Sequence, residues 1–296
     1  MDELLRGING AEDIRIVTAV TTELTREGCR RHALSGPEAV VLGRALTAGC
    51  LLATLTKNDD ERVRIQLRGV GPAGALLVDA RSDGTVRGCL ERRAGLALVE
   101  HEGGRISIAN LVGRAGQIVV TRDIGLEQEY QGVVEVVAGE IDVDLERYLT
   151  VSEQLPSVLV CEVMLDARGE VLRAAGILCQ TFPGADGRVL DRIRSTVLGG
   201  GLGDLLLHER TATDVAGFAL LGAAFSVVES RTLEFKCRCD RDRALSVLST
   251  LGADDVDALA EEQGETEVKC SYCNRAYVLT SDDLRDLAQR LREARS

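Results

Sequence analysis

Residues 235–239 read Phe-Lys-Cys-Arg-Cys, and residues 270–274 read Cys-Ser-Tyr-Cys-Asn. These stretches hold two close pairs of cysteines, with 30 residues between Cys239 and Cys270. Four thiolates from two such pairs can converge tetrahedrally on Zn²⁺. Asn274 suits a tight turn after the last cysteine, because asparagine tolerates the left-handed backbone conformation. The spacing therefore predicts a zinc site made of four cysteines: Cys237, Cys239, Cys270 and Cys273.

The predicted site is structural rather than catalytic. Residues 233–296 contain no histidine, so a mixed cysteine and histidine site is excluded within this unit. Four cysteine ligands leave no open coordination position, which argues against Lewis-acid catalysis. The alternative is that the cysteines are buried as small hydrophobic side chains, but their neighbours in the sequence are polar or charged. Those neighbours are Lys236, Arg238, Asp240, Lys269, Ser271, Asn274 and Arg275.

Residues 233–296 form a unit that is too small to be stable without the metal. A domain of about 60 residues buries only ~60% of the surface that its unfolded chain exposes. Structural zinc contributes an apparent ~10–16 kcal/mol in finger-type peptides, whereas a whole domain is typically stable by about 5–15 kcal/mol. Residues 254–267 also carry seven acidic residues with no lysine or arginine between them. Loss of the metal is therefore expected to unfold this unit.

The same four groups are open to oxidation. Zinc holds them as thiolates, which are the nucleophilic form of cysteine. Oxidants convert thiolates to sulfenic acids and then to disulfides. Each pair is close enough in sequence to form a bridge, Cys237 with Cys239 and Cys270 with Cys273. Such bridges would eject the metal and unfold the unit, so the pattern predicts a redox switch.

Upstream of this unit, residues 1–182 carry the pattern of an α+β domain, in which a mixed sheet packs with helices. Strands are predicted where charged and apolar residues alternate, or where short apolar runs end in turn residues. They are expected at 62–68, 75–79, 85–90, 105–108, 117–121, 131–137, 157–164 and 175–180. A long apolar helix is predicted from Ser35, whose S-x-x-E pattern with Glu38 resembles a capping box, to Lys57.

Phe182-Pro183-Gly184 marks the predicted end of this domain, and residues 183–232 are predicted to be a mostly helical linker. Apolar residues from Val189 to Leu198 fall at helical spacing, and glycines 199–201 supply a stop. The stretch Val215–Val228 is uncharged and apolar, and it reads as a core element. The linker must therefore lie on another surface to hide its apolar side.

Composition excludes several classes of protein. The chain has 296 residues and a formal net charge of −12. Nucleic-acid binding draws on lysine and arginine contacts to phosphates, so this charge argues against it and against docking on anionic lipid. The start, MDELLRG, lacks the basic and apolar stretches of a signal peptide. Val215–Val228 is too short to span a bilayer. We therefore expect a cytoplasmic protein, where thiols stay reduced.

Further stretches carry a resemblance to a known family. The C-terminal run around the four cysteines resembles that of the redox-regulated bacterial heat-shock holdases, the 33 kDa chaperonin family. The resemblance extends over nearly the whole chain through LGRALTA at 42–48, GVGPAG at 69–74, YLTVSEQLPS at 148–157 and AGILCQ at 175–180. Val215–Val228 departs from the family pattern because it is more apolar than expected for its linker.

The resemblance implies a mechanism. The reduced protein would hold one zinc ion and be inactive, with Cys237, Cys239, Cys270 and Cys273 as its metal and redox positions. Oxidant combined with heat or another unfolding stress would form two disulfides and release the zinc. The linker would then melt, and the protein, commonly as a dimer, would hold unfolding client proteins without ATP. The resemblance implies no enzymatic activity.

Two other functions compete with this one. Four-cysteine sites also occur in nucleic-acid-binding zinc ribbons, which the acidic charge disfavours. Cys270 and Cys273 have the C-x-x-C spacing of a thiol–disulfide oxidoreductase, but that motif normally lies at a strand–helix junction rather than between two strands. The G-x-G-x-x-G at 69–74 is interpreted as a tight turn, because Pro72 and a following strand replace the helix of a dinucleotide site.

The five remaining cysteines have no motif that gives them a role. Cys50, Cys161 and Cys179 lie in apolar stretches and are predicted to be inert core residues. Cys29 follows Gly28 in a polar stretch, so it is expected to be exposed, and the pattern around Cys89 favours neither environment.

Overall fold

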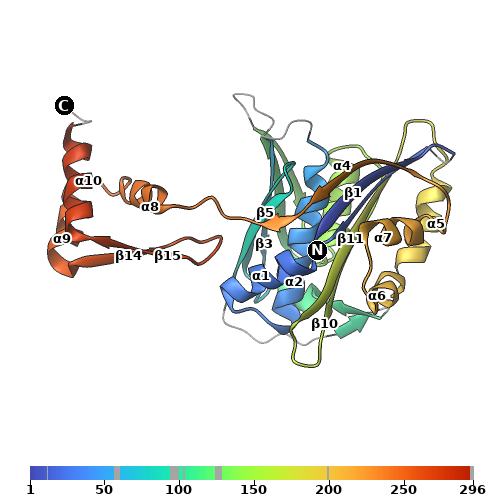
Figure 1. Ribbon diagram of the computed structural model, residues 1–296, viewed down its shortest axis with the longest axis horizontal. Helices are drawn as coiled ribbons and strands as arrows, with labels where there is room; N and C mark the ends of the chain where they lie inside the picture. The colour runs from blue at the N-terminus through green and yellow to red at the C-terminus, as the bar shows by residue number, and fades with distance from the viewer. Residues whose placement is uncertain are drawn as a thin grey trace. The chain divides into compact units, whose positions relative to one another are not determined.

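The computed structural model describes residues 1–11, 13–56, 61–93, 100–102, 104–123, 129–198 and 200–293 (Figure 1). The chain divides into two compact units, Met1–Lys236 and Cys237–Ser296. Both units combine helices with strands, so the predicted α+β class is confirmed. Lys57 and Gly199, where the sequence predicts a helix end and a stop, lie outside the described residues.

The first unit contains an antiparallel five-stranded sheet in the order β10-β11-β2-β1-β12. Its strands are β1 (Glu3–Asn9), β2 (Ile14–Val20), β10 (Ser157–Leu165), β11 (Val171–Thr181) and β12 (Ser226–Thr232). The predicted strands at 157–164 and 175–180 are confirmed as parts of β10 and β11. The sheet therefore joins the two ends of the first unit, because β1 pairs with β12 along its edge.

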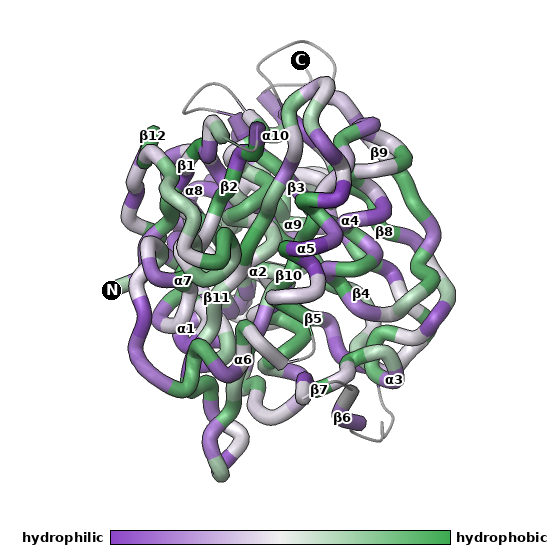
Figure 2. Tube along the Cα trace, turned by 90° about the vertical axis from the view of Figure 1, so that its right-hand side faces the viewer, coloured by the Kyte–Doolittle hydropathy of each residue, from purple (hydrophilic) through white to green (hydrophobic). Residues whose placement is uncertain are grey.

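A second sheet in the first unit has six strands in the order β13-β5-β4-β3-β8-β9. They are β3 (Arg62–Gly69), β4 (Ala75–Arg81), β5 (Thr85–Glu91), β8 (Gly116–Asp123), β9 (Tyr130–Glu135) and β13 (Glu234–Phe235). A separate small hairpin joins β6 (Glu100–Glu102) to β7 (Arg105–Ser107). Hydrophilic and hydrophobic residues alternate along β3 (Figure 2), and this strand buries every second side chain. The period-2 pattern of the sequence predicted β3 correctly, and the strands predicted at 75–79, 85–90, 105–108, 117–121 and 131–137 match β4, β5, β7, β8 and β9. The sequence did not predict β6 and β13.

The helix α2 (Gly36–Ala53) packs against strands of both sheets and forms the centre of the first unit. By length and composition it is apolar enough to cross a membrane, but 83% of it is buried inside the protein. The predicted capping box is wrong: the Ser35 side chain makes no cap hydrogen bond, and Glu38 pairs with Arg92 instead. Three further helices contact α2: α1 (Thr22–His32), α3 (Ala109–Val112) and α4 (Ile141–Val151).

A chain of buried ion pairs connects α2 to its surroundings. Arg44 is 0% exposed, and its guanidinium contacts Glu140 at 2.7 Å and Glu162 at 3.4 Å. Arg105 contacts the same Glu162 at 2.8 Å and Asp142 at 2.7 Å. Burial opposes ionisation of Asp142, but Arg105 and Arg44 hold the pKa of this carboxyl below its usual value. Both arginines are therefore kept in the interior by carboxylates that β10 and the start of α4 supply.

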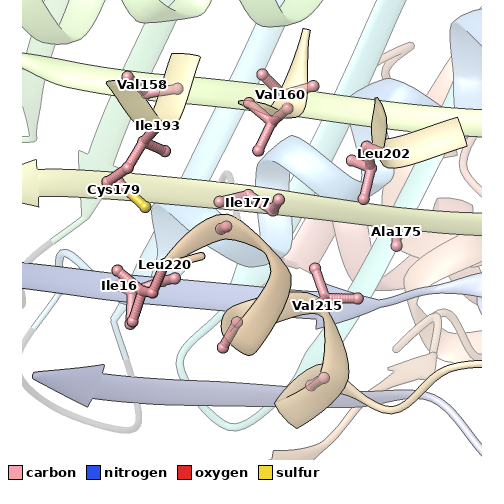
Figure 3. Close-up of a cluster of buried hydrophobic side chains, with 14 of the residues drawn as sticks. Ile16, Val158, Val160, Ala175, Ile177, Cys179, Ile193, Leu202, Val215 and Leu220 are labelled. Carbon is pink, nitrogen blue, oxygen red and sulfur yellow. The ribbon is translucent and has the colours of Figure 1, made fainter. Parts of the chain in front are cut away.

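The outer face of the five-stranded sheet is covered by α5 (Arg188–Val197), α6 (Gly201–Leu206) and α7 (Ala212–Ala219). Ile193, Leu202 and Val215 of these helices point toward the strands, where they meet side chains such as Val160 and Ile177 (Figure 3). Next to Ile177 in the strand, the backbone of Gly176 faces α2 on the opposite side. The predicted linker helices thus pack on an apolar sheet face.

The end of the predicted helical segment is a strand, so the prediction is wrong for residues 226–232. Leu221 and Gly222 have φ values of 54° and 78°, and they turn the chain out of α7. Val227 and Val228 then lie exposed in β12 rather than in a core. Pairing with the free edge of β1 outweighs the helical preference that the apolar run suggested.

The second unit contains α8 (Arg241–Leu248), α9 (Ala253–Gln263), β14 (Glu265–Lys269), β15 (Ala276–Thr280) and α10 (Ser281–Glu293). Asp240 caps α8 by accepting a hydrogen bond from the Arg243 backbone at 2.8 Å. Val256, Leu279 and Leu284 are 0% exposed and form the centre of a small core. This core contains few large side chains, as expected for a unit of its size.

Candidate metal centre

The structure brings together all four cysteines that the sequence predicts as ligands. Cys237 and Cys239 lie in the extended segment before α8, and Cys270 and Cys273 lie in the turn between β14 and β15. The four sulfur atoms all lie within 4.8 Å of one another. Cys237 Sγ is 3.7 Å from Cys270 Sγ, and Cys239 Sγ is 3.3 Å from Cys273 Sγ. Each of these two contacts joins one cysteine of the first pair to one of the second.

These distances fit a tetrahedral zinc site. A Zn–S bond of about 2.3 Å places the sulfur atoms of a tetrahedron about 3.8 Å apart. The nine cysteines of the chain are all free thiols in this structure, so no disulfide holds the four together. Four thiolates would occupy every position around a tetrahedral ion. The donor set therefore suits a closed structural site for a thiophilic cation.

The turn that carries Cys270 and Cys273 is shaped by its backbone. Asn274 has a φ of 57°, which confirms the left-handed conformation expected for it. The Asn274 N–H donates to Cys270 O at 2.8 Å, and the Cys270 N–H donates to Arg275 O at 3.0 Å. Backbone N–H groups of Tyr272 and Cys273 also donate to the Cys270 sulfur. The turn thus directs several N–H dipoles at the position where negative charge would accumulate.

A side chain that the sequence reasoning did not assign to the site completes its surroundings. The Tyr277 hydroxyl on β15 donates a hydrogen bond to Cys239 Sγ at 3.2 Å. The Arg275 guanidinium lies over the Tyr277 ring, 5.3 Å from its centroid. The sequence signal was a tyrosine four residues after Cys273, but nothing in the sequence alone shows that it faces Cys239.

The four thiols are not equivalent. Burial opposes ionisation of Cys239, but hydrogen bonds from Tyr277 and from the neighbouring cysteines lower its pKa to about 7. Burial raises the pKa of Cys273, and its contacts with Cys239 and Cys237 raise it further. Burial likewise raises the pKa of Cys270. Without metal, Cys239 therefore ionises more readily than Cys270 or Cys273.

The other cysteines lie away from this group. Cys50, Cys161 and Cys179 are buried and burial raises the pKa of each thiol, so the prediction of inert core residues is confirmed. The expectation for Cys29 is wrong, because it is only 3% exposed and burial raises its pKa to about 12. Its side chain lies on the inner face of α1, which the polar sequence around it conceals. Cys89 is half-buried on β5.

The remaining sequence motifs have structural roles. Residues 70–73 of the glycine motif form a turn, as predicted, and Gly71 N–H donates to Val112 O at 3.0 Å. A Cβ atom at Gly71 would lie 2.1 Å from Leu111 O, so the glycine permits this close approach. Glu153 accepts hydrogen bonds from Tyr148 and from Arg122, and so it ties the end of α4 to β8.

The chain is similar to one family along almost its full length. A family model described as Hsp33 protein matches residues 2–280. A 33 kDa chaperonin of Trichodesmium erythraeum is 36% identical over 296 residues, covering 99% of this chain and 94% of that protein. A 33 kDa chaperonin of Geobacter sulfurreducens is 35% identical over 294 residues, covering 99% of this chain and 95% of that protein. The crystal structure of a 33 kDa chaperonin from Thermotoga maritima matches with a TM-score of 0.86 and 29% sequence identity. The match covers 98% of this chain and 99% of that one.

Proposed function

Because the chain belongs to the Hsp33 family, we propose that it is a redox-regulated, ATP-independent chaperone that holds unfolding proteins. The observation that supports the regulatory part is the group of four cysteine sulfur atoms within 4.8 Å of one another. In the resting state, these thiolates would bind one zinc ion and keep the second unit folded. Zinc supplies charge neutralisation and a fixed tetrahedral geometry when bound.

Oxidation would dismantle this site. In our proposal, Cys237 bridges to Cys239 and Cys270 bridges to Cys273. Each bridge releases two electrons, and one molecule of hydrogen peroxide takes them up with two protons to give two molecules of water. A sulfur atom in a disulfide no longer carries the negative charge that binds the metal, so zinc leaves. The second unit then loses the stabilisation on which its small core depends.

We propose three functional segments: a core of residues 1–182, a linker of residues 183–232 and a switch of residues 233–296. The linker includes the helices that cover the apolar sheet face. Polar contacts add to this packing: Arg194 pairs with Glu146 at 2.8 Å and donates to Ser157 O at 3.3 Å. The Thr18 hydroxyl donates to Ala212 O at 2.7 Å, and the Ala212 N–H donates to the Glu3 carboxylate at 2.7 Å. Its release would expose a continuous apolar surface, which is the kind of surface that unfolding clients bind.

The partners in this proposal are unfolded or misfolding proteins and, in the oxidised state, a second copy of the chain. The proposed location is the cytoplasm, where a reducing environment would keep the switch off until oxidative stress. The proposal assigns no enzymatic activity, no nucleic-acid partner and no membrane partner. Binding to single-stranded RNA with a steep salt dependence would favour the zinc-ribbon alternative instead.

The test of the proposed function is zinc release measured together with client aggregation. Peroxide at elevated temperature is expected to release one zinc ion as four thiols are lost, and the oxidised protein should suppress aggregation of an unfolding client. Peptide mapping of the oxidised protein should find the Cys237–Cys239 and Cys270–Cys273 bridges. A Cys239–Cys273 bridge, which joins the pair that lies 3.3 Å apart, would contradict the assigned pairing. Retention of zinc, or an oxidised form without effect on the client, would refute the proposal.

Weakening the helical cover should activate the protein without oxidant. Ile193 of α5 is 0% exposed against the sheet, and Ile193→Ala is expected to weaken packing by about 2–5 kcal/mol. The reduced, zinc-loaded variant should then bind more hydrophobic dye and suppress client aggregation more than the reduced wild type does. The matched control is Leu207→Ala, because Leu207 follows α6 and is 61% exposed. Equal activity of Ile193→Ala and wild type would show that the cover does not control client binding.

A further inference from the structure

Tyr277 donates a hydrogen bond to Cys239 from outside the group of four cysteines. The hydroxyl lies 3.2 Å from Sγ, and the tyrosine side chain is mostly buried, with a relative exposure of 9%. The N–H groups of Tyr272 and Cys273 that donate to the Cys270 sulfur belong to the backbone, so these hydrogen bonds follow from the fold of that turn. The bond to Cys239 comes from a side chain and can vary independently of the fold.

This hydrogen bond bears directly on the reactivity of the sulfur atom. A thiolate attacks peroxide through a lone pair, and an O–H donor draws electron density from that sulfur. The Arg275 guanidinium over the ring, 5.3 Å from its centroid, withdraws charge from the phenol and strengthens the hydroxyl as a donor. Both groups stand beside the metal site without occupying a coordination position.

We propose that Tyr277 is a positioning residue that restrains oxidation of Cys239 and so sets the oxidant threshold of the switch. This inference rests on the proposed redox function. In the restrained step, the Cys239 sulfur attacks one oxygen of hydrogen peroxide, the O–O bond breaks, and hydroxide leaves. A neighbouring thiolate then attacks the sulfenic acid and expels a second hydroxide as the disulfide forms. The phenol remains intact and acts only through its hydrogen bond.

The testing variant is Tyr277→Phe, which keeps the ring and removes the hydroxyl. Hydrogen bonds to charged groups are stronger than neutral ones, and part of this bond must be lost as the sulfur reacts. Peroxide-driven zinc release, followed with a chromogenic chelator, is therefore expected to be about three- to tenfold faster than in the wild type. The control is Tyr130→Phe, because Tyr130 lies in β9 of the first unit and is 42% exposed.

Two further measurements separate restraint from simple weakening of the site. Without peroxide, transfer of zinc to a competing chelator should be no faster in Tyr277→Phe, because a thiolate without the hydrogen bond donates to metal at least as well. In the cobalt-substituted protein, the sulfur-to-cobalt charge-transfer band should move to longer wavelength, since the sulfur lone pair is no longer stabilised. Circular dichroism of the zinc-loaded variant should match that of the wild type.

The outcomes are distinct. Zinc release by peroxide at the wild-type rate, or an unshifted cobalt band, would overturn the role of Tyr277. Equal acceleration of release by peroxide and by chelator would also overturn it, because that result indicates a loosened site. If the wild-type protein itself retains its zinc in peroxide, the redox function fails first, and the inference that rests on it falls for that separate reason.

Discussion

Replacing Cys237, Cys239, Cys270 and Cys273 together by serine is expected to unfold the second unit while residues 1–182 stay folded. Serine hydroxyls do not replace thiolates as zinc ligands, so the variant loses the apparent ~10–16 kcal/mol that structural zinc supplies in finger-type peptides. That exceeds what a core built around Val256, Leu279 and Leu284 is expected to provide. Removal of zinc from the reduced wild type with a strong chelator should have the same effect.

Limited proteolysis and hydrogen exchange would measure this result. In the serine variant, cleavage should become rapid across residues 237–293, while amides in β2, β10 and β11 keep their protection. Cys89→Ser serves as the control, because Cys89 is a half-buried cysteine outside the four-cysteine group. A serine variant whose second unit resists protease as well as the wild type would show that the metal does not hold this unit together.

Glu162→Ala is expected to cost the first unit about 3–5 kcal/mol of stability, because it leaves two interior guanidinium groups short of a partner. Arg44 and Arg105 both contact the carboxylate of Glu162, whose side chain is 5% exposed. Urea titration of the reduced, zinc-loaded protein should show a lower midpoint for the transition of the first unit. Glu162→Gln keeps the shape of the side chain and one acceptor oxygen, so its urea midpoint should lie between those of the alanine variant and the wild type.

The control for this prediction is an ion pair of the same kind on the surface. Glu23 pairs with Arg26 at 2.7 Å, and its side chain is 62% exposed. Exposed pairs contribute about 0–1 kcal/mol, so Glu23→Ala should leave the midpoint almost unchanged. A comparable small loss in Glu162→Ala would mean that water or repacking compensates for the missing carboxylate.

Much of the six-stranded sheet could be predicted from the sequence because one of its faces is buried and the other is open. Along Arg62–Gly69, polar residues on the open face alternate with apolar residues on the buried face. β2 could not be predicted in this way, because as an interior strand it has buried residues on both faces, and Ile16, Val17 and Thr18 are all 0% exposed. β12 depends on its pairing with β1, and local sequence does not encode so distant a partner.

The candidate site shows the same division between local and distant information. The two cysteine pairs are separated by a short helical unit, so their spacing alone predicted that they would converge. The hydroxyl of Tyr277 reaches Cys239 from a strand 38 residues further along the chain, and that contact depends on the packing of β15. Arg44 likewise lies in an apolar helix, where the sequence shows a charge but none of its three-dimensional partners.

The pairing of β1 with β12 has a consequence for synthesis on the ribosome. The strand that pairs with the edge of β1 is β12, which is synthesised about 220 residues later. At a translation rate of about 5–20 residues per second, that delay is roughly 10–45 s. During this interval the nascent chain carries an open strand edge, which is a template for association with other chains. Newly made copies of this protein should therefore need protection themselves before they can reach the folded state.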